Sequence, residues 1–150
     1  MALPSLSPLR SHSVFVECVP PKTTAQQNLR VFNGRIVRSR KQIEGAAPLL
    51  ALLGEQAPPE PLSGALSVTL EVVWPWRKSD LATRAGRELA QRSGRLYVPV
   101  KPDLDNYAKG VLDWLVALQY LERDELVVEL ILRKFVGAKP GLGIRIEEVG

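Results

Sequence analysis

The sequence is poor in two residue types on which many sites depend, since it has one cysteine, Cys18, and one histidine, His12. A lone cysteine cannot form an intramolecular disulfide, which is typical of proteins from a reducing compartment. The same scarcity excludes zinc sites built from several cysteines and histidines, as well as the HExxH metalloprotease motif. Residues 1–13 have no continuous apolar stretch, so no secretory signal is predicted. The most apolar run, residues 46–53, is too short to span a bilayer.

The charges are unevenly distributed within a net charge of +4. Residues 1–41 and 77–101 are basic, with net charges of +6 and +5, whereas residues 42–76 and 102–150 are acidic, with −4 and −3. Cations that hold phosphates, next to carboxylates that hold a metal, would suit a nuclease. A solvated surface gives the same totals and is the commoner cause, so charge alone does not decide.

The 150 residues suit one domain with its own core, and the local patterns predict an α+β fold. Strands are expected at residues 14–19, 65–74, 126–136 and 142–149, with a hairpin at 30–39 around Asn33-Gly34. Helices are expected at residues 41–54, which Pro48 would kink or divide, and at residues 105–119, where apolar residues recur every three and four positions. The sequence therefore predicts a mixed sheet of about five strands with two or three helices, in a single domain over residues 1–150.

A long basic stretch, residues 76–100, separates two of these elements. Because Gly86 and Gly94 weaken any helix there, we expect an insertion or mobile loop that carries charge to DNA. Strand alternation places Trp74 in the core. Trp76 lies beside two bases and is a candidate for stacking on a nucleic-acid base.

Acidic residues and a lysine gather in residues 101–109, KPDLDNYAK. Pro102 keeps the preceding residue extended, and residues two apart in an extended segment point the same way. Asp103 and Asp105 are therefore expected to aim their carboxylates together. Asp105 then sits where an N-cap would sit, and Lys109 lies one turn along the predicted helix. A helix N-terminus also favours anions such as phosphate.

Carboxylates held close together stay ionised when a cation lies between them. Mg²⁺ binds through one or two carboxylates, waters and a substrate phosphate, and a metal of this kind can turn water into a nucleophile. A strand beside the helix N-terminus could return a third acid, Asp124, to the first two. An ordinary surface explains the same residues: Asp105 could cap the helix and pair with Lys109 for about 0.3–0.5 kcal/mol, Asp103 could belong to a turn, and Asp124 to a loop. Spacing alone does not favour the metal site.

The run KPDLDNYAKGVLDWL, followed by Asp124 and an apolar strand ending in Lys134, resembles the RusA family of Holliday-junction resolvases. The family's motif has the form K-P-D-x-D-N-x-x-K-x-x-x-D-x-L, followed by an acidic pair before a strand, and every fixed position of the first segment is present. The resemblance extends more weakly over most of the chain. It implies a RusA-like fold and an endodeoxyribonuclease that uses Mg²⁺, for which Mn²⁺ could substitute, to resolve four-way DNA junctions.

The resemblance also implies roles for individual residues. The family's metal-binding and catalytic aspartates are matched by Asp103, Asp105 and Asp124, and its catalytic lysine by Lys109. Asn106 and Asp113 match supporting positions, where Asn106 could orient a carboxylate and Asp113 could pair with Lys109 or face solvent.

In one place the chain departs from the family. Arg123 precedes Asp124, where an acidic pair is usual. Asp124 is aligned with the essential second acid of that pair, and Glu122 or Glu125 could serve instead if the register slips.

The candidates for phosphate contacts come from the two basic segments, although each alone is more often a solvated residue. They are Lys22, Arg30, Arg35, Arg38, Arg40, Lys41, Arg77, Lys78, Arg84 and Arg87. A four-way junction has near two-fold symmetry and needs two nicks, so a homodimer is expected, as the resemblance also implies. Neither a membrane nor a nucleotide cofactor is expected. The implied setting is the bacterial cytoplasm, since family members are frequent in phage and prophage genomes.

Two other functions stay open at this point. One is a phage-associated protein that binds DNA or junctions without cleaving them, which the intact set of acids and lysine disfavours. The other is a metal-dependent nuclease for flaps, single strands or RNA. The motif does not separate this second function from junction resolution, because substrate shape is recognised by the dimer surface and the loops.

Overall fold

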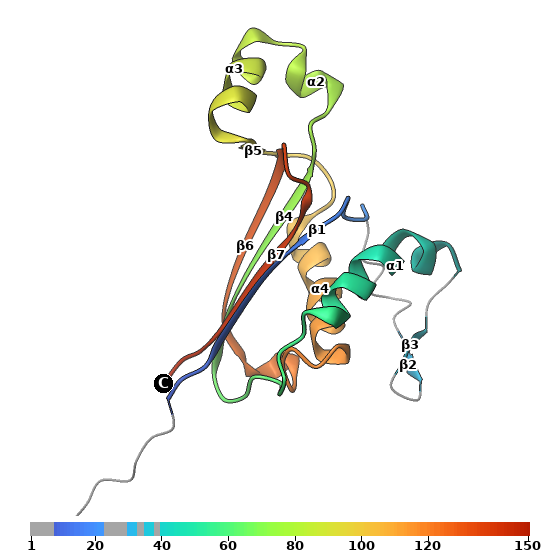
Figure 1. Cartoon of the computed structure of the whole chain (residues 1–150), viewed down its shortest axis with the longest axis vertical. Coiled ribbons are helices and arrows are strands. Elements are labelled where there is room, and N and C mark those ends of the chain that lie inside the picture. The colour runs from blue at the N-terminus through green and yellow to red at the C-terminus, as the bar shows by residue number, and fades with distance from the viewer. Residues whose placement is uncertain (1–7, 23–29, 33–34, 38–39) are drawn as a thin grey trace, which may run out of the picture.

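A mixed five-stranded sheet dominates the computed structural model, which describes residues 8–22, 30–32, 35–37 and 40–150 (Figure 1). The strand order is β1-β7-β4-β6-β5. These strands are β1 (Ser11–Glu17), β4 (Leu66–Pro75), β5 (Arg95–Tyr97), β6 (Val127–Gly137) and β7 (Gly141–Glu148). Only β4 and β6 are parallel neighbours, and the other pairs are antiparallel. The predicted α+β fold with one mixed sheet of five strands is confirmed.

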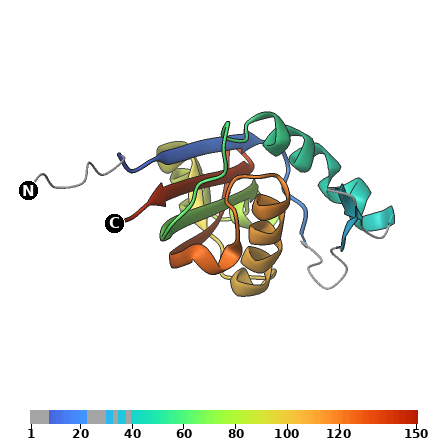
Figure 2. The ribbon, with the colours of Figure 1, turned by 90° about the horizontal axis from the view of Figure 1, so that it is seen from below.

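Two long helices, α1 (Arg40–Glu55) and α4 (Leu104–Ala117), lie on the same face of the sheet (Figures 1 and 2). Pro48 lies inside α1 and does not divide it into two helices. A short 3-10 turn, η2 (Asp124–Leu126), follows α4 and leads into β6. The predicted hairpin forms from β2 (Arg30–Phe32) and β3 (Arg35–Val37), while its Asn33-Gly34 turn lies outside the described residues.

The core lies between the sheet and these helices. Alternate residues of β4 face it, with Leu66, Val68 and Val72 almost fully buried, and Trp74 joins them as predicted. From α4, Val111, Trp114 and Leu115 pack onto this surface. The apolar alternation and the helical periodicity therefore meet in one core, as binary patterning requires.

The segment β4–α4–β6 fixes where the functional residues lie. Because β4 and β6 are parallel, the chain must return along the sheet between them, and α4 makes that return. The N-terminus of α4 therefore lies toward the C-terminal ends of both strands, and the residues after α4 lie toward their N-terminal ends (Figure 1). A β-bridge between Leu62, shortly before β4, and Leu121, after α4 and before β6, agrees with this placement of the residues that follow α4.

Residues 76–100 form α2 (Lys78–Leu81), α3 (Arg84–Ser93) and β5, so the mobile-loop alternative is wrong, whereas the insertion stays a prediction. The Asp80 carboxylate binds Arg77 through its backbone N–H at 2.9 Å and through its guanidinium. Thr83 Oγ1 accepts from Gly86 N at 3.0 Å and caps α3, which ends at Gly94 with φ of 71°. These caps make two short helices from a sequence of low helix propensity, and so the chain has more helices than predicted.

Gly86 is the point where α3 meets α2. A Cβ on this residue would lie 1.8 Å from the carbonyl oxygen of Asp80. Gly86→Ala is expected to lower the free energy of unfolding by about 1–3 kcal/mol and to raise amide hydrogen exchange across residues 78–93, since the backbones cannot approach. Gly54→Ala is the matched control, because its Cβ would meet only Leu118 at 3.9 Å. Equal protection of residues 78–93 in both variants would contradict this packing.

A carboxylate network joins the start of β1 to the end of β7. Glu148 accepts hydrogen bonds from the Arg10 guanidinium, at 2.8 and 3.1 Å, and from the backbone N–H groups of Arg10 and Ser63. The Arg10 guanidinium, followed by these backbone donors, lowers the pKa of Glu148 from 4.5 to about 2. The stability it contributes is therefore complete above pH 4.5 and is lost as the pH falls toward 2.

This linkage predicts that the free energy of unfolding, measured by denaturant unfolding, falls less between pH 6 and pH 3 in Glu148→Gln than in the unmodified protein. Glu60→Gln should leave the loss unchanged, because exposed Glu60 approaches Arg10 only to 3.9 Å. The account of this network fails if Glu148→Gln and the unmodified protein lose the same stability on acidification.

Candidate active site at the start of helix α4

The segment that leads into α4 is held by a lysine from β6. Lys134 Nζ donates hydrogen bonds to the carbonyl oxygens of Val100 and Pro102, the latter at 2.9 Å. The backbone N–H of Val98 also donates to the Lys134 carbonyl at 3.3 Å. Lys134 thus ties the second half of β6 to the residues just before Asp103. Its position after an apolar run is the signal in the sequence, although sequence reasoning assigned it no role.

Asp103 takes the N-cap position of α4. Its backbone carbonyl accepts from Tyr107 N at 3.0 Å, whereas its carboxylate makes no capping hydrogen bond. The expectation that Asp105 is the N-cap is wrong, because Leu104 and Asp105 are already helical, and alternation along an extended strand does not apply to them. Both carboxylates are exposed in the first turn of the helix. They are therefore open to a ligand where the helix dipole is positive.

The other predicted residues of this motif follow along α4. Lys109 is exposed one helical turn after Asp105, and Asn106, which directly follows Asp105 in the chain, is also exposed. Asp113 is half-buried a further turn along. Asp103, Asp105 and Lys109 thus all lie within the N-terminal half of α4 or at its N-cap.

Aromatic residues fix this end of α4 to the sheet. Tyr107 donates its hydroxyl hydrogen to the carbonyl of Pro21 at 2.9 Å, and its ring meets that of Trp74 edge-on at 5.5 Å between centroids. Lys22 Nζ lies 4.8 Å from the centroid of the Trp74 ring. Lys22, predicted only from the charge pattern, therefore comes close to the start of α4. Trp76 is half-buried against the core, so little of it is available for stacking on a base.

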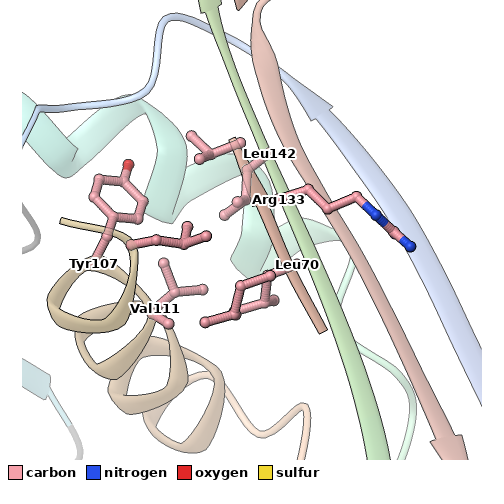
Figure 3. Close-up of a pocket in the computed structure, with 9 residues that line it drawn as sticks. Leu70, Tyr107, Val111, Arg133 and Leu142 are labelled. Carbon is pink, nitrogen blue, oxygen red and sulfur yellow. The ribbon is translucent and has the colours of Figure 1, made fainter. Parts of the chain in front are cut away.

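Figure 3 shows a small apolar pocket between α4 and the sheet. Tyr107 and Val111 face Leu70 and Leu142 across it, and the guanidinium of Arg133 points away toward the other face of the sheet. No acid lines this pocket. It marks the packing of α4 on the strands rather than a place for a metal or a phosphate.

Asp124 lies at the other end of α4. It begins η2, before the first residue of β6, and only the second half of β6 reaches Lys134 and the start of α4. A helix of 14 residues is about 21 Å long. In the described part of the chain, no group of three or more acids, histidines or cysteines is placed to hold a metal. The expectation that a strand returns Asp124 to Asp103 within one chain is therefore wrong. Asp124 precedes the strand, so it stays at the far end.

The neighbouring acids do not change this result. Glu122 and Glu125 are exposed in the same region as Asp124, and Glu125 pairs with Arg123 at 3.3 Å. A shift of the register by one or two residues therefore leaves the third acid at the far end of α4.

The basic candidates divide into three groups. Arg77 is held by Asp80, Arg84 pairs with Glu88 at 3.2 Å, Arg87 donates to the Leu81 carbonyl at 3.0 Å, and Lys78 is exposed. These four lie on the α2–α3 pair, which projects beyond the C-terminal ends of β4 and β6 (Figure 1). Lys22 lies on Trp74. The third group lies outside what the structure describes, and it consists of Arg38 and the side chains of Arg30, Arg35, Arg40 and Lys41.

A comparison with protein families matches residues 19–147 to the family described as endodeoxyribonuclease RusA. This chain belongs to the RusA family. The match spans the acidic motif, Asp124 and the α2–α3 pair. RusA proteins are metal-dependent endodeoxyribonucleases that resolve Holliday junctions, so the chain is a hydrolase that acts on branched DNA.

A relative from Bacillus subtilis (strain 168), "Uncharacterized protein YqaN", is 38% identical over 101 residues, which cover 67% of this chain and 70% of the relative. Its name gives no function, so the RusA family match alone identifies the chain. Among the residues that the structure describes, none of the helices has the length and apolar character needed to cross a bilayer.

The RusA site gives a prediction for Lys134. Lys134→Met keeps most of the aliphatic stem and removes both hydrogen bonds to the carbonyls before Asp103. We expect a loss of about 1–2 kcal/mol in the free energy of unfolding and faster amide exchange at residues 98–104. Arg133→Met is the matched control, since Arg133 pairs with Glu71 on the other face. If both variants leave residues 98–104 equally protected, Lys134 does not hold this segment.

Proposed function

We propose that this RusA protein is a Mg²⁺-dependent endonuclease that resolves four-way DNA junctions by paired symmetric nicks, and that Mn²⁺ can replace Mg²⁺. The observation that supports it most is the start of α4. There Asp103 and Asp105 are exposed, neither is a side-chain cap, and Lys109 lies one turn away. No other part of the described chain combines acids, a lysine and a helix N-terminus in the family's motif.

The donor set fits a hard divalent cation. Mg²⁺ prefers carboxylate oxygens, water and substrate phosphate, and Asp103 and Asp105 supply the carboxylates. When bound, such an ion neutralises charge on the phosphate and makes water a stronger nucleophile. Lys109 stabilises the charge that develops on the scissile phosphate, and the helix dipole at the N-terminus of α4 favours the same phosphate. Asn106 and Asp113 support this set by orienting a carboxylate and the lysine.

The third acid of this set comes from a second subunit. Asp124 lies at the far end of α4, so one chain holds only part of the set. A junction of near two-fold symmetry needs two nicks, and a homodimer offers two equivalent sites. The incomplete site of one chain and the symmetry of the substrate thus call for the same assembly.

The phosphate contacts belong to the same end of the sheet as Asp103. Lys78, Arg84 and Arg87 on the α2–α3 pair, with Lys22 beside Trp74, lie toward the C-terminal ends of the strands. Arg77 remains a candidate for phosphate contact as well, although its guanidinium is also held by the buried Asp80 carboxylate. The basic residues of the β2–β3 region remain predictions for DNA contact.

The test uses a labelled four-way junction, a linear duplex, a single strand and a flap, each with and without Mg²⁺. The unmodified protein should nick only the junction, symmetrically and only with metal. Asp103→Asn should lower the rate at least about a hundredfold, the scale of losing one preorganised electrostatic group, while junction binding remains. Glu55→Gln, an exposed acid on α1, is the control and should cut normally.

Two results would contradict the proposal in different ways. Binding of the junction with no metal-dependent cleavage would indicate a DNA-binding protein without activity. Preferential cutting of flaps, single strands or RNA would indicate a metal-dependent nuclease of another specificity.

A further inference from the structure

The face of the sheet opposite α1 and α4, which we call the outer face, carries an aromatic side chain that lies largely in solvent. Tyr97 of β5 is 66% exposed, more than any other aromatic residue whose side chain the structure describes. Its hydroxyl makes no hydrogen bond within the described part of the chain. By contrast, Trp76, the stacking candidate from the sequence, is half-buried against the core. Single exposed apolar side chains are common, so the surroundings of Tyr97 must show whether it has a role.

The Tyr97 ring is held in place from one side. It stacks on the ring of Phe135, its paired residue on β6, with 4.8 Å between centroids and 27° between planes. Phe135 lies two residues after Arg133, whose guanidinium points to the outer face, so the stack lies there too (Figure 3). The Arg95 guanidinium lies 4.7 Å from the Phe135 centroid, and its Nη1 pairs with the Glu71 carboxylate at 3.6 Å. We call Tyr97, Phe135 and Arg95 the aromatic platform.

The aromatic platform is fixed relative to the candidate active site. Phe135 and Lys134 are consecutive residues of β6, so their side chains leave opposite faces of the sheet. Phe135 supports Tyr97, whereas Lys134 Nζ holds the Pro102 carbonyl, directly before Asp103. Asp103 follows Tyr97 by six residues, so the two Cα atoms lie within about 22 Å of each other. One stretch of β6 therefore positions both the platform and the segment that leads to the acids.

The chemistry of the platform suits an unstacked nucleic-acid base. Bases stack on exposed aromatic rings with little dependence on sequence, and a ring that is already fixed loses little freedom on binding. The platform lies within or beside the basic segment 77–101, whose net charge of +5 attracts a polyanion rather than an apolar peptide. Every internal base of a linear duplex lies inside the stack, whereas bases at the exchange point of an opened four-way junction lose a neighbour. An open aromatic face therefore distinguishes the branch from the arms.

We propose that Tyr97 binds an unstacked base at the exchange point of a four-way junction and thereby positions the junction for cleavage by the acids of α4. This inference rests on the proposed function and adds a residue that recognises the branch. Tyr97 acts on the position of the substrate rather than in the chemical step, because it lies on the outer face and α4 covers the other face.

The first test places a photoreactive base, iodouracil, either at the exchange point of a four-way junction or in the middle of one arm. Binding takes place without divalent metal, so that no strand is cut, and the cross-linked residue is identified by mass spectrometry after irradiation. Iodouracil at the exchange point should cross-link to Tyr97, and iodouracil in the arm should not. Absence of this cross-link, or equal cross-linking from the arm, would overturn the proposal.

The second test compares binding to a junction and to a linear duplex in matched variants that replace an exposed ring by an aliphatic side chain. Tyr97→Leu should weaken junction binding at least about fivefold, the scale of one stacked base, and leave duplex binding unchanged. Phe15→Leu is the control and should bind normally, because Phe15 is 38% exposed on β1, at the opposite edge of the sheet. Tyr97→Phe should bind like the unmodified protein, since it keeps the ring.

Thermal unfolding of these variants separates base binding from a purely structural role. A ring that only shields Phe135 from water would give Tyr97→Leu a lower melting temperature with an unchanged preference for junction over duplex. That result would contradict a contact between Tyr97 and the branch.

Neither test requires cleavage, so both are independent of the catalytic part of the proposed function. A cross-link from the exchange point to Tyr97, in a protein that never cuts junctions, would refute the function and leave the base contact intact. Normal cleavage of junctions, with equal junction binding by Tyr97→Leu and Phe15→Leu, would refute the base contact and leave the function intact.

Discussion

The parallel pairing of β4 with β6 is the constraint on which the rest of this structure depends. Two parallel neighbours require a return crossover, and here that crossover is α4. The return places the start of α4, with Asp103 and Asp105, at the C-terminal ends of the strands. The same return leaves Asp124 at their N-terminal ends. One chain of this topology therefore separates acids that the motif suggests should act together.

The same topology is consistent with the proposal that cations and acids serve one site. The α2–α3 pair follows directly after the C-terminal end of β4, and the next strand, β5, pairs with the C-terminal end of β6. Basic side chains on that pair therefore lie at the same end of the sheet as Asp103. In open sheets, ligands commonly bind near the C-terminal ends of parallel strands, and a phosphate backbone guided by these cations would reach the first turn of α4.

Local patterns in the sequence predicted most of the fold. The alternation in β4 placed Trp74 in the core, where the structure has it, and the three- and four-residue spacing predicted the long helix α4. The predicted strands agree with β4, β6 and β7 to within one residue at each end, because their periodicity is strong. The predicted helix 105–119 begins one residue earlier and ends at Ala117, since Gln119 has a φ of 66°.

Other features depend on contacts that a local pattern does not show. Gly86 was taken as a helix breaker, yet its missing side chain lets α3 approach the Asp80 carbonyl. The position of Asp124 depends on which strands are parallel, which spacing along the chain does not reveal. The hydrogen bond from Lys134 to the Pro102 carbonyl joins residues 32 positions apart, so it can be found only once the fold is known. Sequence patterns thus propose the members of the site but do not show where the fold places them.

The most direct measurement is anomalous diffraction from crystals of the unmodified protein soaked in Mn²⁺. The account predicts Mn²⁺ at the start of α4 in each chain, with carboxylate oxygens of Asp103 and Asp105 about 2.1 Å away and Asp124 of the partner subunit among the ligands. Mn²⁺ bound at the start of α4 with Asp124 of both chains far from it would contradict the account.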